Sequence, residues 1–268
     1  LNPKFYFNQS LLAENYYLNN NNNQAIKILE KFKKKDKLYF WYKTKKIGRI
    51  LSEDNSEEEA IKYINKNFNS IKKPTEKILY DYANINKGFE KYEIAIEYYT
   101  ELLKNVDQSS YAISRILYRR GSSYERTGNY EKADRDLIES LKMYPNEPYT
   151  LNYLAYSWLE RNYKIDEAID MIQEAYKQKE NDPYITDSVG WGFYLIGDYI
   201  NAEKYLKKAL QLMPDDPIVN DHYGDVLWKL NKKLQAKYYW QAVLGLEETE
   251  DEMKSKVKSK LLEGLEKS

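Results

Sequence analysis

The sequence predicts an all-α protein, a right-handed superhelical solenoid of about seven helix-turn-helix repeats followed by a C-terminal capping helix. Three observations predict it: helical spacing of apolar residues, a repeat length of 34 to 38 residues, and two matching registers of small residues. The segment 182–216 shows all three. Its first helix carries Val189 and Gly190, its turn contains Gly197, its second helix carries Ala202, and Pro214 ends it.

The small residues define the repeat. A small residue at the start of an expected second helix lets that helix approach its partner closely. Seven such residues follow one another at spacings of 35, 35, 38, 35, 34 and 34: Ala25, Ala60, Ala95, Ala133, Ala168, Ala202 and Ala236. Twelve residues before each of them, or thirteen in repeat five, stands a second small residue: Ala13, Gly48, Ala83, Gly121, Ala155, Gly190 and Gly224.

The expected elements follow from these registers. We predict a solenoid over residues 1–246, with repeats at about 3–36, 37–72, 74–106, 110–147, 148–182, 183–216 and 217–246, and a capping helix over 247–268. Ser56 and Glu59 have the spacing of a capping box, so Ser56 is expected to begin the second helix of repeat two. The last segment begins with acidic residues and becomes lysine-rich, which suits the helix dipole.

This pattern resembles the tetratricopeptide repeat (TPR), whose period is about 34 residues. The resemblance implies a non-enzymatic scaffold or adaptor that binds a partner protein or peptide in a concave groove lined by the first helix of each repeat. About the last 80 residues also resemble the C-terminal repeats of long proteobacterial TPR proteins, through Gly190-Trp191 and through His222, Gly224, Asp225, Leu227 and Trp228. Many of those proteins are exported or lipid-anchored. The resemblance therefore implies an alternative function, an envelope-associated lipoprotein adaptor for a periplasmic protease or assembly machine, with a periplasmic or outer-membrane-anchored location.

The groove positions give the candidate partner-binding residues. Repeats two and four supply a basic half, and repeats five to seven supply an aromatic and acidic half, an arrangement that could fix the direction of a bound peptide. The candidates are Lys45, Lys46, Arg49, Arg115, Arg119, Tyr153, Tyr156, Asp187, Trp191, Asp221, His222 and Asp225. The same register also places Ser122, Tyr149, Asn152, Tyr184 and Ser188 in the groove. An alternative stays open, in which Trp191 and the tyrosines pack between repeats.

Composition narrows the function classes. The formal net charge is zero, so the lysine runs are interpreted as solvated helix ends and no nucleic-acid partner is expected. The chain has no cysteine and one histidine, and we expect no cofactor and no metal. A metal or acid–base role for Asp221, His222 and Asp225 is the weaker interpretation, because a groove helix presents such residues without catalysis.

The sequence contains no apolar run near the 20 or so residues that span a membrane. It begins at Leu1, so we expect a fragment whose missing part could hold a signal or an anchor. A further alternative makes the chain an accessory repeat region of an enzyme whose catalytic domain lies in that missing part. The sequence leaves the oligomeric state and the partner's identity open.

Overall fold

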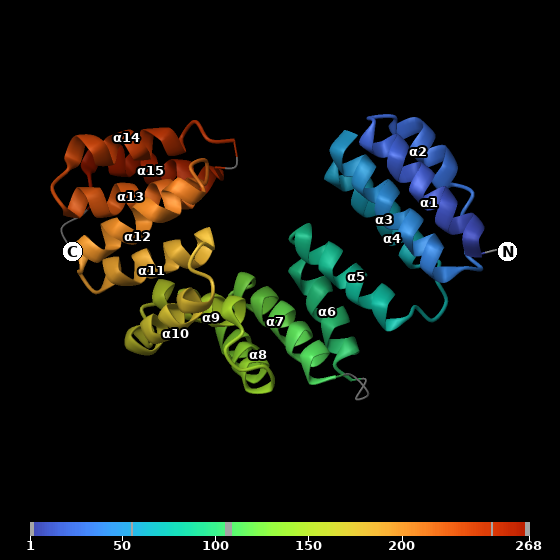
Figure 1. The fold of residues 1–268 in the computed structure, drawn as a ribbon, viewed down its shortest axis with the longest axis horizontal. Coiled ribbons are helices and arrows are strands. Elements are labelled where there is room, and N and C mark those ends of the chain that lie inside the picture. Colours follow the sequence, from blue (N-terminus) through green and yellow to red (C-terminus); the bar gives the residue numbers. More distant parts are fainter. Residues whose placement is uncertain (1–2, 55, 105–108, 248, 266–268) are drawn as a thin grey trace. The chain divides into compact units, whose positions relative to one another are not determined.

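The computed structural model describes residues 3–54, 56–104, 109–247 and 249–265. Within these residues it contains fifteen α-helices and no strand, so the predicted all-α class is confirmed (Figure 1). The expected ends at residues 1 and 268 and the expected boundary at residue 106 lie outside the described residues.

Contacts divide the chain into two compact units, which are described separately. Unit 1 is Leu1–Ser109 with Arg126–Tyr130, and unit 2 is Ser110–Glu125 with Glu131–Ser268. The helices of unit 1 are α1 (Pro3–Leu18), α2 (Asn22–Leu29), α3 (Lys37–Asp54), α4 (Glu57–Phe68), α5 (Glu76–Gly88) and α6 (Tyr92–Leu102). Unit 2 holds nearly all of α7 (Ser110–Arg126) and α8 (Tyr130–Met143), then α9 (Pro148–Glu160), α10 (Ile165–Gln178), α11 (Pro183–Leu195), α12 (Tyr199–Leu212), α13 (Pro217–Lys229), α14 (Lys233–Val243) and α15 (Asp251–Glu263). The extent of one continuous solenoid stays a prediction.

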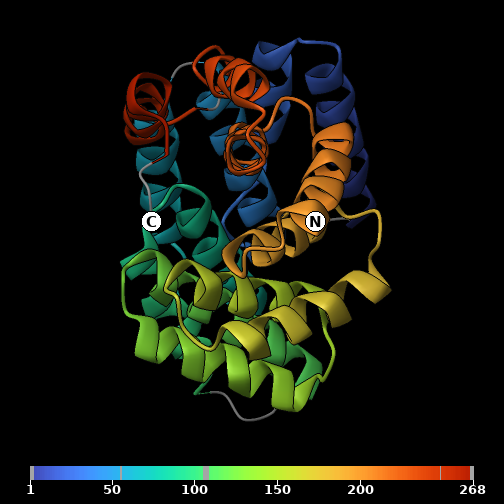
Figure 2. The ribbon, with the colours of Figure 1, turned by 90° about the vertical axis from the view of Figure 1, so that its left-hand side faces the viewer.

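Consecutive helices pack as pairs. In unit 1 the pairs are α1 with α2, α3 with α4 and α5 with α6, and in unit 2 they are α9 with α10, α11 with α12 and α13 with α14 (Figures 1 and 2). Helices α7 and α8 are joined by the ion pair of Arg120 with Asp136, whose nitrogen and oxygen lie 2.6 Å apart. Helix α15 packs on α14.

The small-residue registers lie in the seams of these pairs. The alanines of both registers are at most 1% exposed. A side chain on Gly190 would place its Cβ 2.6 Å from Cγ of Leu206, and one on Gly121 would place it 2.9 Å from Cγ of Leu137. The helix pairs are therefore too close for anything larger than glycine at these two sites.

The turns inside six of the helix pairs share one backbone feature in the described residues. Each of these six turns contains a residue with positive φ, five or six positions before the alanine that opens the second helix: Asn20, Glu90, Gly128, Asn162, Gly197 and Asn231. Glycine adopts this conformation at little cost, and asparagine is the side-chain residue most often found there. Glu90 is the exception, with φ of 57°.

Side-chain caps fix several helix starts. Ser56 accepts a hydrogen bond from the backbone N–H of Glu59, which confirms it as the start of α4. Asp182 and Asp216 cap α11 and α13 in the same way, and each is followed by a proline in the first turn. Proline fits there because its missing N–H would have no partner inside the helix.

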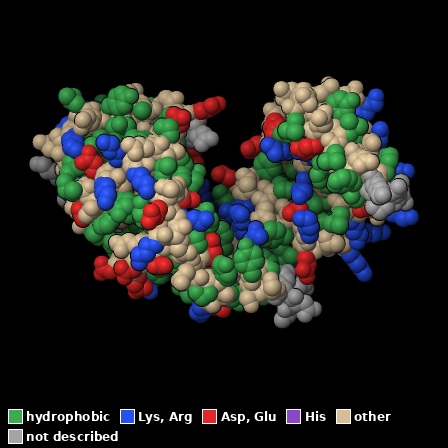
Figure 3. Space-filling view, in the orientation of Figure 1, with side chains coloured by type: hydrophobic (Ala, Val, Ile, Leu, Met, Phe, Trp, Pro, Cys, Tyr) green, Lys and Arg blue, Asp and Glu red, His purple; other side chains and the backbone are tan. Residues whose placement is uncertain are grey.

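On the face of each unit that Figure 3 shows, Lys and Arg side chains are interspersed with Asp and Glu side chains, as the zero net charge suggests. Among the described residues, no helix combines the length and the apolar character that a membrane span requires.

Candidate functional site

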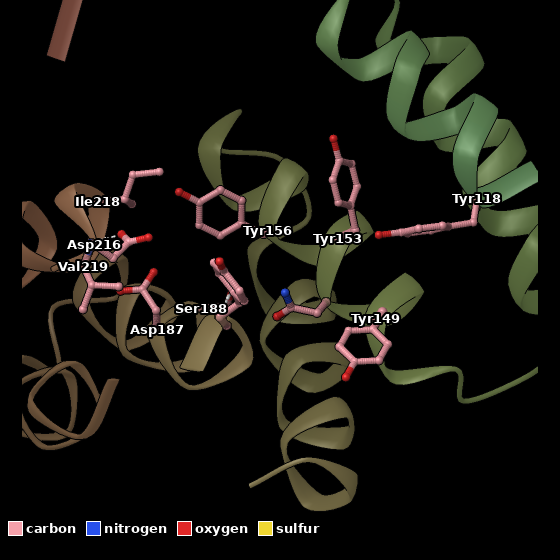
Figure 4. A pocket seen from close by; sticks show the side chains of 11 residues that line it. Tyr118, Tyr149, Tyr153, Tyr156, Asp187, Ser188, Asp216, Ile218 and Val219 are labelled. Atoms are coloured by element: carbon pink, nitrogen blue, oxygen red, sulfur yellow. Dashed lines mark hydrogen bonds between the residues drawn. The ribbon is translucent and has the colours of Figure 1, made fainter. Parts of the chain in front are cut away.

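A tyrosine-rich pocket lies in unit 2. Its volume is about 300 Å³. It is lined by first helices of successive pairs, through Tyr118 of α7, through Tyr149, Asn152, Tyr153 and Tyr156 of α9, through Tyr184, Asp187 and Ser188 of α11, and through Asp216, Ile218 and Val219 at the start of α13 (Figure 4). We call this the tyrosine pocket.

Helical spacing explains why these side chains converge. The four residues of α9 stand at positions i, i+3, i+4 and i+7, which lie on one face of a helix. The residues of α11 stand at i, i+3 and i+4. Each first helix therefore turns one polar and aromatic face toward the pocket, while its small residues face its own second helix.

The wall of the pocket is held in place by specific contacts. The hydroxyl of Tyr153 donates a hydrogen bond to Oε2 of Glu125 at 2.8 Å. The ring of Tyr153 packs edge-to-face on that of Tyr118, with centroids 5.9 Å apart. Burial, followed by the charges of Glu160 and Asp187, raises the pKa of Tyr156, so its phenol stays neutral.

One polar atom of the wall is unsatisfied. The carbonyl oxygen Oδ1 of the Asn152 side chain is buried and has no hydrogen-bond donor among the described residues. A buried acceptor without a donor costs about 1–3 kcal/mol. This atom is a candidate ligand contact because Asn152 lines the pocket.

Asp187 belongs to a buried cluster behind the pocket. Its Oδ2 lies 3.0 Å from Nδ1 of His222, and both residues are about 5% exposed. Trp191 stacks on His222 with centroids 4.0 Å apart and on Tyr194 at 4.6 Å, and its N–H donates to Glu160 at 2.7 Å. Burial lowers the pKa of His222, but the carboxylates of Asp187, Asp221 and Asp225 together outweigh burial, and the net pKa lies above the ordinary value.

A second buried cluster joins α13 to α15. Nζ of Lys260 lies 2.7 Å from Asp221 and 2.8 Å from Asp225, and the indole N–H of Trp240 donates to Asp225 at 2.9 Å. Burial and then the charge of Asp221 raise the pKa of Asp225 to about 6. No group of three or more His, Asp or Glu side chains in the described part of the chain is arranged to hold a metal ion.

A second pocket adjoins the tyrosine pocket. Its volume is about 620 Å³, and it shares Tyr118 and Tyr149 with the first. Arg115, Arg119 and Lys179 contribute basic groups to its lining. We call it the basic pocket.

The structure distributes the sequence candidates over several places. Tyr153, Tyr156 and Asp187 line the tyrosine pocket, and Arg115 and Arg119 line the basic pocket. Four others line neither pocket and contact protein groups instead: Trp191, Asp221, His222 and Asp225. Asp187, His222 and Asp225 were expected to present exposed surface, and the structure instead buries them at 5%, 6% and 5% exposure.

The remaining three candidates lie in unit 1, each with a carboxylate partner. Lys45 pairs with Asp81 at 2.7 Å, Lys46 with Glu14 at 2.7 Å and Arg49 with Glu53 at 2.9 Å. Their charges are thus locally compensated.

Sequence reasoning missed Tyr118, Asp216 and the Lys260 contact. Tyr118 lies on the same face of α7 as Arg115 and Ser122, three and four residues away, so helical spacing could have found it. Lys260 could not be found this way, since its partners are 35 and 39 residues distant and depend on how α15 docks.

Comparison with known proteins identifies the repeat. The tetratricopeptide repeat family matches residues 114–147, the α7 and α8 pair that contributes Tyr118 to the pocket. This stretch is a tetratricopeptide repeat. The chain is 32% identical over 152 residues to a TPR repeat-containing protein of Pseudomonas aeruginosa, a match that covers 51% of this chain and 26% of that protein. It is 24% identical over 120 residues to anaphase-promoting complex subunit 3 of Schizosaccharomyces pombe, covering 45% of this chain and 16% of that one.

Solved TPR structures share the fold. A tetratricopeptide repeat protein from Parabacteroides merdae has a TM-score of 0.73 at 15% identity, covering 95% of this chain and 98% of its own. A TPR protein from Thermus thermophilus has a TM-score of 0.59 at 17% identity, covering 70% and 100%. At identities of 15% and 17%, these structures show similarity of fold alone. The chain spans about a quarter or less of the length of the Pseudomonas and Schizosaccharomyces proteins.

Proposed function

We propose that this TPR chain is a protein-interaction scaffold or adaptor that binds a segment of a partner protein in the tyrosine pocket and the adjoining basic pocket of unit 2. The tetratricopeptide fold suggests the general role, since proteins built from this repeat generally act as non-catalytic scaffolds. We infer the same non-catalytic role here.

The observation that carries the proposal is the convergence of five tyrosines from three first helices on one pocket. Tyrosine supplies a large rigid contact area and a polar hydroxyl, and it is enriched among residues that dominate interface energetics. Tyr149 and Tyr184 are 46% and 62% exposed, so their rings are accessible to a partner.

The two pockets also support a direction for the bound segment. The tyrosine pocket carries Asp187 and Asp216, whereas the basic pocket carries Arg115, Arg119 and Lys179. Because the pockets meet at Tyr118 and Tyr149, a bound segment meets opposite charges on the two sides of these rings. The basic residues that repeat two was predicted to supply lie in unit 1 and are not part of this proposal.

The experiment that tests the proposal is selection of a phage-displayed random dodecapeptide library on the protein. Peptides that bind are then measured against the double variant Tyr149→Ala, Tyr184→Ala, with Tyr238→Ala on α14 as the matched control. Tyr238 is 69% exposed and does not line either pocket. We expect affinity to fall at least about tenfold in the double variant and to stay unchanged in the control. Failure to select any peptide, or equal binding by the double variant, contradicts the proposal.

Trp191 is a less direct part of the proposed site. Its ring already stacks on His222 and Tyr194 and its N–H is bonded to Glu160. We propose that it supports the position of Asp187 through His222. In that case Trp191→Ala lowers the melting temperature along with partner affinity, whereas a lower melting temperature with full affinity removes Trp191 from the site.

A further inference from the structure

We propose that the tyrosine pocket takes a cationic side chain, arginine or lysine, of the partner segment. This inference rests on the proposed function and adds the chemical class of the group that enters the pocket. Its two supports are aromatic rings beside carboxylates, and an unsatisfied hydrogen-bond acceptor in the wall.

The rings provide the first part of a cation site. Tyr118, Tyr149, Tyr153, Tyr156 and Tyr184 line a volume of about 300 Å³, which is at the small end of the range for ligand pockets. The face of a tyrosine ring carries negative potential and attracts ammonium and guanidinium groups, and rings arranged around one volume form an aromatic cage. The pocket also offers the stem of a long cationic side chain an apolar contact with Ile218 and Val219.

The charges that line the tyrosine pocket itself are one-sided, whereas Arg115, Arg119 and Lys179 line the adjoining basic pocket. Among the described residues that line the pocket, Asp187 and Asp216 carry carboxylates, and none is a lysine or an arginine. Figure 4 shows both carboxylates on the side of the pocket next to Tyr156 and Ile218. Two more carboxylates lie near the pocket. Glu125 accepts a hydrogen bond from the hydroxyl of Tyr153, and Glu160 accepts one from the indole N–H of Trp191.

The effect of these charges is visible at Tyr156. Burial raises the pKa of its phenol, and the charges that raise it further are those of Glu160, Asp187, Glu125 and Asp216. The imidazole of His222 pairs with Asp187 from behind the pocket. A cation that enters beside Tyr156 is therefore attracted by the surplus of negative charge.

Asn152 adds a directional contact. Its buried side-chain oxygen has no donor in the described part of the chain, although it belongs to a residue that lines the pocket. A guanidinium or ammonium group carries only donors, so its N–H can satisfy this oxygen once the amide of Asn152 turns toward the pocket. A neutral apolar side chain would fill the pocket and leave the oxygen unpaired.

The test uses the peptides selected on the protein. We expect an arginine or lysine to be enriched at one position, and replacement of that arginine by citrulline, which keeps the shape and removes the charge, to weaken binding about tenfold. The binding of the arginine peptide should also weaken with added salt more than that of the citrulline peptide.

A pair of protein variants separates charge from folding. Asp216→Asn keeps the cap of α13, because asparagine caps a helix as well as aspartate does, and removes one negative charge from the pocket. Asp198→Asn makes the same change at the cap of α12, which does not line the pocket. We expect Asp216→Asn to weaken binding of the arginine peptide about three- to tenfold and to leave binding of the citrulline peptide unchanged. Asp198→Asn should change the binding of neither peptide.

The outcomes separate the two proposals. Selected peptides that need Tyr149 and Tyr184 but contain no enriched cation overturn the cation site and leave the binding function standing. Equal binding of the arginine and citrulline peptides also overturns it. If no peptide is selected, the proposed function itself fails. Thermal unfolding of each variant, followed by circular dichroism, shows whether a loss of binding reflects a loss of fold.

Discussion

Two glycines of α11, separated by one residue, face different surroundings. A Cβ on Gly190 would lie 2.9 Å from the backbone nitrogen of Leu206, which cannot move without shifting α12. A Cβ on Gly192 would lie 3.4 Å from Cγ1 of Ile169 and 3.5 Å from Cδ1 of Leu159, which is close to ordinary contact.

We therefore expect Gly190→Ala to lower the free energy of unfolding by about 1–3 kcal/mol through overpacking. Gly192→Ala should be neutral or slightly stabilising, because alanine is favoured over glycine inside a helix by about 1 kcal/mol. Urea unfolding of the two variants measures both values. Equal stability of the two would show that the small-residue register is assigned wrongly.

The buried pair of His222 with Asp187 predicts a pH dependence. Burial opposes the charge on His222, but Asp187, with Asp221 and Asp225, raises its net pKa above the ordinary 6.5. A raised pKa means that the folded state binds the proton more tightly than the unfolded state. The stabilisation is fully present below pH 6.5 and is lost as the pH rises through the folded-state pKa.

The measurement is the melting temperature of the wild type and of His222→Gln between about pH 5 and about pH 9. Glutamine can still donate a hydrogen bond to Asp187 but cannot titrate. We expect the advantage of the wild type to be largest at the acidic end and to shrink toward the basic end. The subtraction removes most of the contribution of Asp225, whose own raised pKa acts in the same direction. A constant difference would mean that His222 does not change protonation in this range.

At the scale of elements, one lysine of α15 forms ion pairs with two carboxylates of α13. Lys260 is 19% exposed and binds two carboxylates, of Asp221 and Asp225, that are 15% and 7% exposed. Lys256 of the same helix pairs with Glu252, and these side chains are 68% and 77% exposed. The two lysines carry the same charge on the same helix and differ in burial.

We expect Lys260→Gln to cost about 2–4 kcal/mol, since it leaves two largely buried carboxylates without their cation. Lys256→Gln should cost less than about 0.5 kcal/mol, because an exposed pair is screened by water and salt. Chemical unfolding measures both. Adding Asp221→Asn and Asp225→Asn to Lys260→Gln should recover part of the loss, and a similar cost for the two single variants would contradict the role assigned to Lys260.

At the scale of the whole molecule, the helices that pack most closely in the described residues are near neighbours in the chain. Helix α11 packs with α9, α10, α12 and α13, and α3 packs with α2 and α4. In such an array a local change affects the stability of the adjoining helix pairs and leaves distant ones nearly unchanged.

Gly190→Ala should therefore increase amide hydrogen exchange in α11 and α12, and to a smaller extent in α10 and α13. Exchange in α3 and α4, in unit 1, should stay as in the wild type. Hydrogen exchange followed by mass spectrometry resolves these segments. A uniform increase along the chain would show that the protein opens as one cooperative unit.

Much of the fold could be predicted from the sequence because its determinants are local and repeated. The alanine and glycine registers, the caps such as Ser56, and the turn glycines such as Gly197 act within one helix pair, so their spacing is visible in the chain. The pocket tyrosines of α9 were also predictable, since residues at i, i+3, i+4 and i+7 share a helix face.

The sequence by itself determined the helix-pair repeat and the side of each first helix that carries polar and aromatic residues. Only the tertiary structure decided how those residues are used. The side chains of Asp187 and His222 stand 35 residues apart, and either could have faced solvent. Packing of α11 against α13 turned them toward each other, and the docking of α15 placed Lys260 on Asp221 and Asp225. Repeat spacing fixes which face a residue occupies, whereas burial and partner depend on the distance between neighbouring helices, which the summed packing of all side chains sets.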